Sequence, residues 1–231
     1  VNLNQQLALF HFLLSKFGFN DFNAVQRVFA HLELDDSVSE SSPFYTLLAN
    51  QISFPLEMLH QYDANILNHL QTINWQKEIP IKLKYYQYFS LLLTEYYLDA
   101  SLNNLHELKD ELNLFIQQST VAPIRSLPPY ETEDLNKLAF WNATGSGKTF
   151  ILHINILQYK YYAVKFSKPY NTLILLTPSK DLTTQHLADL ENSGISATYY
   201  GYDKESPNVK VLDIHKIREY SSGQGMTFTL P

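Results

Sequence analysis

The chain has 231 residues, of which 45% are hydrophobic and 17% charged, a composition typical of packed globular proteins and not of disordered ones. Its formal net charge of −6 excludes a protein that is basic throughout, so any contact with nucleic acid must be local or supplied by another part. The absence of cysteine excludes disulfides and thiolate metal sites and indicates a cytoplasmic location, and no apolar run approaches the ~20 residues of a membrane span, so no membrane partner is expected.

Residues 1–78 are expected to form a helical N-terminal domain. Apolar residues recur at helical spacing from Leu7 onward, and Gly18 follows as a C-terminal cap. Asp21 and Pro55 are typical of helix starts, and no part of this region alternates as a half-buried strand would. Helices are therefore expected at about 7–17, 22–31 and 55–73, with an acidic, serine-rich loop at 35–43.

A second domain is expected over residues 79–231, and it begins with a helical lead-in at 80–118. The apolar and aromatic side chains that follow Pro80 line one face of a long helix. A second helix is expected at about 102–117, after which three prolines predict a loop at 119–133.

From residue 138 onward the pattern changes to strands and helices in alternation. Leu138-Ala139-Phe140-Trp141 is a short apolar run that suits a buried strand. This alternation predicts the parallel sheet of an α/β fold. Further strands are expected at 172–176, 197–200 and 209–213, and helices at 149–164 and 179–192.

The strongest functional signal is the run Asn142-Ala143-Thr144-Gly145-Ser146-Gly147-Lys148-Thr149, which ends in the G-x-G-K-T of a phosphate-binding loop. Two glycines let the backbone turn tightly, so that several N–H groups converge on a triphosphate. At the start of the following helix, Lys148 would reach the β- and γ-oxygens, and the Thr149 hydroxyl would ligate Mg²⁺. The alternative is a chance Gly-Lys-Thr in a loop, but the motif lies between an expected strand and an expected helix. ATP and Mg²⁺ are therefore the expected cofactors, held by Thr144, Gly145, Ser146, Gly147, Lys148 and Thr149, with Lys148 and Thr149 also catalytic.

Residues 143–149 resemble motif I of superfamily 2 helicases, in the Ala-Thr-Gly-x-Gly-Lys-Thr form of the motor subunits of type I and type III restriction enzymes. Asn142 departs from that group, which often has Met there, but this position precedes the amides that hold phosphate. The resemblance covers about residues 80–220 and implies an incomplete RecA-like parallel sheet behind the helical domain. It also implies an ATP-dependent DNA translocase or helicase subunit of a restriction or phage-defence system, with double-stranded DNA and other subunits as partners.

Two downstream segments are similar to nucleic-acid-binding motifs of the same superfamily. The segment 175–186 resembles motif Ia, which would place Thr177, Pro178 and Ser179 against the nucleic-acid backbone, since a helix start with two hydroxyls suits an anion. The alternative is that Thr177 or Ser179 simply caps the helix. Val209–Lys216 resembles motif Ib, with Lys216 near the nucleic acid, or is an ordinary sheet strand with a solvated end.

Tyr86-Gln87 resembles the element upstream of motif I that reads adenine in this superfamily. A Gln amide offers one donor side and one acceptor side, which can pair with adenine N6 and N7 together. The alternative is a Gln in the middle of an aromatic-rich core helix, because the gap of about sixty residues to motif I is longer than usual.

The acidic pair that such a motor needs is not found in the sequence. In this superfamily an Asp-Glu pair lies downstream of motif Ib, where it orients Mg²⁺ and polarises the attacking water. Residues 217–231 hold only Glu219. The chain is therefore expected to be an N-terminal fragment that ends before motif II and is inactive alone. The rival hypotheses are a P-loop ATPase that acts on protein partners and a nucleotide-gated binding module without translocation.

Overall fold

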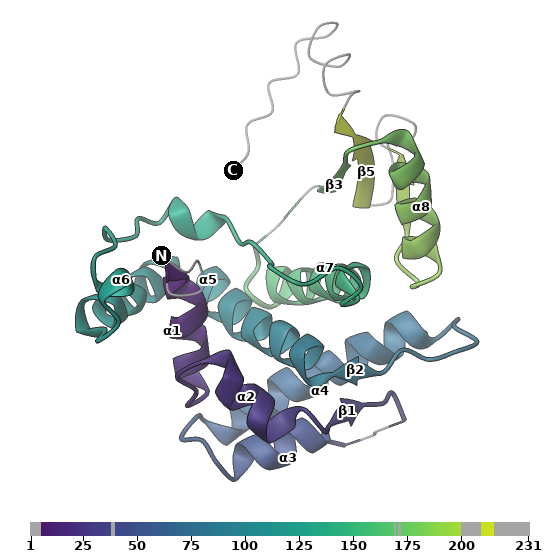
Figure 1. The fold of residues 1–231 in the computed structure, drawn as a ribbon. Coiled ribbons are helices and arrows are strands. Elements are labelled where there is room, and N and C mark those ends of the chain that lie inside the picture. Colours follow the sequence, from purple (N-terminus) through teal and green to yellow (C-terminus); the bar gives the residue numbers. More distant parts are fainter. Residues whose placement is uncertain (1–5, 38–39, 169, 171, 200–208, 215–231) are drawn as a thin grey trace, which may run out of the picture. The chain divides into compact units, whose positions relative to one another are not determined.

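The computed structural model describes residues 6–37, 40–168, 170, 172–199 and 209–214, which are mostly helical with a small parallel sheet (Figure 1). The chain forms two compact units, one of residues 1–71 and 80–168 and the other of 72–79 and 169–231. The first unit holds the helical region together with the phosphate-loop motif, and the second holds the sheet. The domain boundary expected after residue 78 stays a prediction. No helix in the described part of the chain is long and apolar enough to cross a membrane.

The first unit is a helical assembly around α5 (Tyr85–Gln118), the longest helix among the described residues, against which α1, α2, α6 and α7 pack. The expected helix signals are confirmed: Gly18 has φ +76°, and Asp21 Oδ1 accepts a hydrogen bond from the Ala24 amide at 2.8 Å. The other elements are α1 (Ala8–Lys16), α2 (Phe22–Phe29), β1 (Glu33–Leu34), α3 (Pro43–Ala49), α4 (Leu56–Asn74), whose last turn belongs to the second unit, β2 (Leu83–Lys84), α6 (Ala122–Arg125), a 3-10 turn (Asp134–Asn136) and α7 (Lys148–Lys165).

Two short strands and two short helices were not expected from the sequence. Strands β1 and β2 pair in antiparallel fashion, Leu34 opposite Leu83, and are only two residues long, too short to show a periodic pattern. Helix α3 begins at Pro43 in the segment after the acidic loop, where the Ser42 hydroxyl accepts from the Tyr45 amide at 3.0 Å. Helix α6 is a single turn inside the proline-rich region that was expected to be a loop.

The core of this unit is aromatic and includes two fully buried carboxylates, Asp63 and Glu95. Phe44 of α3 stacks on Tyr88 of α5 with ring centroids 4.2 Å apart. Beside them Asp63 of α4 is fully buried and accepts from the Ser42 amide at 2.7 Å and from the Tyr88 hydroxyl at 2.5 Å. Burial and the neighbouring carboxylate raise the pKa of the Tyr88 hydroxyl, so it stays a donor. These bonds fix the mutual positions of α3, α4 and α5.

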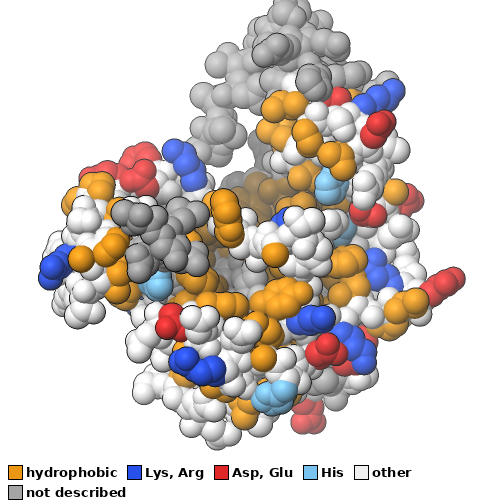
Figure 2. Space-filling view, in the orientation of Figure 1, with side chains coloured by type: hydrophobic (Ala, Val, Ile, Leu, Met, Phe, Trp, Pro, Cys, Tyr) orange, Lys and Arg blue, Asp and Glu red, His pale blue; other side chains and the backbone are white. Residues whose placement is uncertain are grey.

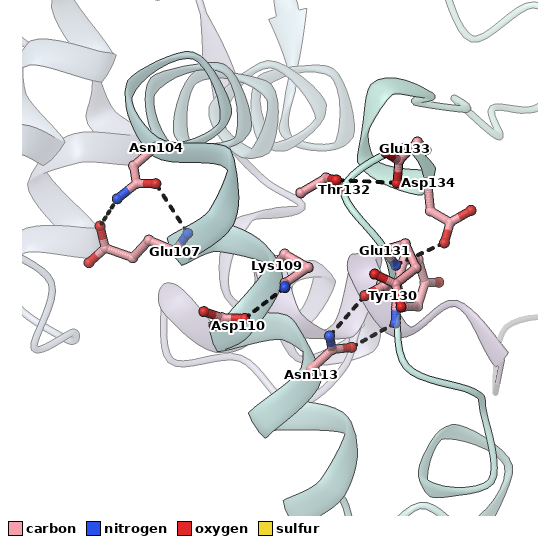
Figure 3. Close-up of polar contacts among 10 residues, drawn as sticks. All are labelled: Asn104, Glu107, Lys109, Asp110, Asn113, Tyr130, Glu131, Thr132, Glu133 and Asp134. Atoms are coloured by element: carbon pink, nitrogen blue, oxygen red, sulfur yellow. Dashed lines mark hydrogen bonds and ion pairs between the residues drawn. The ribbon is translucent and has the colours of Figure 1, made fainter.

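Helix α5 contains a kink where the sequence predicts two separate helices. Asn104 has φ −150° and ψ 88°, outside the helical region. Its side chain caps the second half, because Oδ1 accepts from the Glu107 amide at 3.3 Å and Nδ2 donates to Glu107 Oε2 at 3.1 Å (Figure 3). The nearby Lys109 pairs with Asp110 at 3.1 Å. The polar side chains in this part of α5 therefore bond to residues of the same helix.

The described residues of the second unit form a three-stranded parallel sheet with a helix packed on it. Strands β3 (Leu173–Thr177), β4 (Ala197–Tyr199) and β5 (Val209–Asp213) lie in the order β3-β5-β4. Leu173 lies opposite Val209, and Thr177 lies opposite Asp213. Helix α8 (Lys180–Glu191) connects β3 to β4 and contacts all three strands. The expected strands and helix are confirmed, and the parallel pairing is that of an incomplete RecA-like fold.

The strand expected at Leu138–Trp141 is not formed, and that prediction was wrong. Residues 137–143 have no regular secondary structure, and the side chains of Phe140 and Trp141 are 42% and 83% exposed. A strand exists only through its hydrogen-bonded neighbour. Within the described residues, the three-stranded sheet does not include this run. An apolar run predicts that a segment can be a strand, and it does not supply the partner.

Candidate nucleotide-binding site

The phosphate-loop motif folds into a tight turn that opens directly into α7. Gly145 and Gly147 have φ +76° and +82°, a left-handed conformation that glycine adopts without a Cβ penalty. The Ser146 amide donates to the Ala143 carbonyl at 3.2 Å and closes the turn. Gly147 is the N-cap of α7, so the amides of Lys148 and Thr149 have no intrahelical acceptor, whereas the amides of Phe150 and Ile151 donate to the Gly147 carbonyl at 3.0 and 3.2 Å. The turn-to-helix half of the expected junction is therefore present.

The side chain of Lys148 bonds to the backbone of its own loop. Lys148 is exposed, and its Nζ donates to the Asn142 carbonyl at 3.1 Å and to the Ala143 carbonyl at 2.9 Å. A phosphate anion at the start of the helix would offer this ammonium group stronger, charge-assisted bonds than two neutral carbonyls. Asn142 contributes only a main-chain oxygen to this contact, which is why its side chain can differ from the family pattern.

Gln87 reaches the turn from the first turn of α5, 59 residues earlier in the chain. Its Nε2 donates to the Ser146 carbonyl at 2.9 Å, and its Oε1 accepts from the Lys84 amide at 2.8 Å. The side chain is 7% exposed and is therefore fixed in place. One N–H and one lone pair of the amide remain beyond these two bonds. The structure thus brings Gln87 to the loop, and its pairing with adenine stays a prediction.

The contact with Gln87 distinguishes the two glycines of the loop. A Cβ built on Gly147 would lie far inside van der Waals contact with Gln87 Nε2, whereas a Cβ on Gly145 would meet nothing within 4 Å. Gly147 is therefore required by its backbone conformation and by the approach of Gln87. Gly145 is required by conformation alone, and the space above it is open to a ligand.

Helix α5 also holds the segment that leads into the loop. Asn113 Oδ1 accepts from the Tyr130 amide at 2.7 Å, and Asn113 Nδ2 donates to the Tyr130 carbonyl at 2.9 Å (Figure 3). The buried Tyr97 hydroxyl donates to the Leu135 carbonyl, and burial raises the pKa of Tyr97 to about 12. Sequence reasoning missed both residues, because an Asn and a Tyr on an expected helix carry no signal of a distant backbone partner.

These features fit the phosphates of a nucleotide. The turn presents main-chain amides, an exposed ammonium group and open space above Gly145. The Ser146 hydroxyl is buried and has no hydrogen-bond partner among the described residues. Bound Mg·ATP would supply the reactive phosphoanhydride and the metal, and Thr149, at the second position of α7, would offer its hydroxyl to that metal. Across the described residues, no group of three or more His, Cys, Asp or Glu side chains could hold a metal by itself.

The second expected contact region, Thr177 to Ser179, lies in the sheet unit and uses its hydroxyls internally. Thr177 is 2% exposed, and its Oγ1 lies 2.5 Å from the Thr183 hydroxyl. Ser179 is the N-cap of α8 and accepts from the Leu182 amide at 3.3 Å. The capping alternative therefore describes Ser179, while Pro178 is exposed. A nucleic-acid role for Thr177, Pro178 and Ser179 stays a prediction, and Lys216 lies outside the described residues.

Charged side chains of both signs lie on the face of the molecule that Figure 2 shows. On the face drawn in Figure 2, Lys and Arg side chains are interspersed with Asp and Glu side chains, and neither sign dominates the described surface seen there. This agrees with 17 basic and 23 acidic residues in the whole sequence.

A turn with two left-handed glycines that opens into a helix with Lys148 at its start has the local form of the phosphate-binding loop of P-loop proteins. Residues 80–222, more than half of the chain, match the family model of the type III restriction enzyme res subunit. The chain belongs to this family, a DEAD/DEAH-like branch of the superfamily 2 helicases. Comparison with curated proteins and with solved structures finds no match.

Proposed function

We propose that this chain is the ATP-binding part of a DNA translocase or helicase that works with partner subunits in a cytoplasmic restriction or phage-defence system. Family membership supports the ATPase motor class. The observation that carries the proposal is the turn at Gly145–Gly147, which opens into α7 with Lys148 exposed at its start. This arrangement presents free helix amides and an ammonium group to an anion, as the phosphates of ATP require.

Each residue of the site has a distinct part in this function. The amides at the start of α7 donate hydrogen bonds to the phosphate oxygens, and Lys148 leaves its two carbonyls for the β- and γ-oxygens. Thr149 ligates Mg²⁺ through its hydroxyl. Gln87 holds the turn through the Ser146 carbonyl and reads the base with its remaining donor and acceptor.

Nucleic-acid-stimulated ATP hydrolysis by the full natural protein tests this proposal. We expect ATP turnover to rise on addition of double-stranded DNA, and the stimulated turnover to fall to background in Lys148→Ala. Single-stranded DNA and RNA are the comparison ligands. Hydrolysis that requires Lys148 and responds to no nucleic acid would contradict the motor proposal.

A P-loop ATPase that acts on protein partners is the second candidate. The internal use of the Thr177 and Ser179 hydroxyls and the net charge of −6 favour it. Lys148-dependent hydrolysis that is stimulated by a partner protein and not by DNA would support this candidate instead.

A further inference from the structure

A fully buried carboxylate in the middle of α5 connects this helix to the helix that follows the phosphate loop. Glu95 has no exposed surface and accepts three side-chain hydrogen bonds. Its Oε1 accepts from Gln158 Nε2 at 2.7 Å, and its Oε2 accepts from the Tyr162 hydroxyl at 2.6 Å and from Asn65 Nδ2 at 3.0 Å. Gln158 and Tyr162 belong to α7, and Asn65 belongs to α4.

The bonds from α7 fix how this helix lies on α5. Gln158 and Tyr162 are four residues apart and so share one face of α7, and both are fully buried. Gln158 Nε2 also donates to the Leu91 carbonyl of α5 at 3.0 Å. Apolar contacts are not directional and leave the rotation of α7 about its axis free. These hydrogen bonds are directional and fix both the rotation of α7 and its position along α5.

Glu95 is held by neutral donors and not by an opposite charge. In the part of the chain that is described, no Lys or Arg forms an ion pair with it, and the nearby Lys165 is paired with Asp99 at 2.7 Å. Burial raises the pKa of Glu95 to about 7. A buried carboxylate without a counter-charge adds little net stability compared with an apolar side chain. The arrangement is therefore better explained by the geometry that it imposes on α7.

That geometry is transmitted to the phosphate loop through a continuous helix. Lys148 precedes Gln158 by ten residues, which is about 15 Å of α-helix. At its own start, α5 contacts the loop through Gln87 and the Ser146 carbonyl. Helix α5 thus holds the loop at Gln87 and the helix behind it at Glu95. A rotation of α7 about its axis would move Lys148 and Thr149 relative to the amides of the turn.

We propose that Glu95 is a positioning residue for the phosphate loop: through Gln158 and Tyr162 it sets the rotation of α7 and thereby the placement of Lys148 and Thr149. This inference rests on the proposed nucleotide binding and names the residue that prepares the site for it. Glu95 touches no part of the nucleotide and acts only through α7.

Two buried tyrosines provide a matched test. Tyr162 and Tyr62 both donate to a carboxylate of α5, but Tyr62 belongs to α4 and binds Asp99 at 2.8 Å. The dissociation constant of a fluorescent ATP analogue with Mg²⁺ is measured for Tyr162→Phe and Tyr62→Phe at a temperature where circular dichroism shows both to be folded. We expect Tyr162→Phe to weaken binding about tenfold, the equivalent of about 1.4 kcal/mol, and Tyr62→Phe to bind as the wild type does.

Substitution of Glu95 itself gives a graded second readout. Glu95→Gln keeps one acceptor oxygen and should retain part of the affinity that Glu95→Leu loses. Equal binding by wild type and Tyr162→Phe, or equal loss in the two tyrosine variants, overturns the inference, even if Glu95→Leu fails to fold. Failure of the wild type to bind the analogue at all would instead overturn the proposed function.

Discussion

The phosphate-loop segment and the β3–α8 segment have the same sequence plan but are stabilised differently. Each has an apolar run, a short polar turn and a helix that begins with lysine, Lys148 in one and Lys180 in the other. The β3–α8 segment is satisfied locally, because β3 pairs with β5 and Ser179 caps α8. The phosphate-loop segment has no strand, and its turn is held by Gln87 of α5.

This difference separates a structural turn from one prepared for a ligand. In the β3–α8 turn the Ser179 hydroxyl already accepts from the Leu182 amide at the helix start, and the Thr177 hydroxyl is bonded to that of Thr183. In the phosphate loop the N-cap is Gly147, which has no side chain to occupy it. The first helix amides there remain available for an anion. A turn that binds phosphate must therefore be held from outside, and α5 does so.

The largest effect is expected from removal of the two matched lysines. Lys148→Ala should lower ATP turnover of the natural protein by roughly 100-fold or more, because a charge aimed at the reacting phosphate is lost. Lys180→Ala should leave turnover without nucleic acid unchanged. A steady-state ATPase assay checks both variants, and similar losses in the two would remove the distinction between the turns.

The next effect concerns Gly147 and its contact with Gln87. Gly147→Ala adds left-handed strain of roughly 1–2 kcal/mol and displaces Gln87, so ATP binding should weaken more than in Gly145→Ala, which adds strain alone. In a Gln87→Ala background the two alanine variants should become similar. Titration calorimetry of the four variants measures the coupling, and strictly additive effects would show that Gln87 does not hold the turn.

The free energy of unfolding of the helical unit should depend on pH through Glu95 and His69, whose contributions change in opposite directions with pH. Burial raises the pKa of Glu95 from 4.5 to about 7, so its contribution to stability is present below pH 4.5 and is lost as pH rises to 7. Burial lowers the pKa of His69 from 6.5 to about 4, so its contribution is lost as pH falls from 6.5 to 4. Glu95→Gln removes the contribution of Glu95 and leaves that of His69. As pH falls from 6.5 to 4.5, the free energy of unfolding of this variant should therefore fall more steeply than that of the wild type, by up to about 1.4 kcal/mol per pH unit.

Urea unfolding at several pH values measures this slope. His69→Gln is the control, and between pH 6.5 and 4.5 its stability should fall less steeply than that of the wild type, because the opposing group is lost. Parallel curves for all three proteins would show that neither pKa differs between the folded and unfolded states.

The smallest effect is expected in the β3–α8 turn. Ser179→Ala removes the cap of α8 and should lower the free energy of unfolding by about 1 kcal/mol. ATP binding should not change. Thermal unfolding and nucleotide titration of the same variant check both statements, and a loss of nucleotide affinity would give this turn a role in the ATP site.

Sequence reasoning succeeded where the cause of a structure is local. The caps at Gly18 and Asp21 and the start of α7 depend on neighbouring residues and are confirmed. The expected strand at Leu138–Trp141 failed because pairing depends on a distant segment. The contacts of Asn113 and Glu95 join parts of the chain that are far apart in sequence, and a single sequence shows neither partner.

The most direct test of the phosphate loop is the response of backbone and side-chain amide NMR signals to Mg²⁺ with a non-hydrolysable ATP analogue at millimolar concentration. We expect the largest chemical-shift changes at the amides of residues 145–149 and at the Gln87 side-chain amide, and we expect Lys148→Ala to reduce them. Signals at 145–149 that stay unchanged while the analogue is present in excess, or changes of equal size at the start of α8, would contradict this expectation.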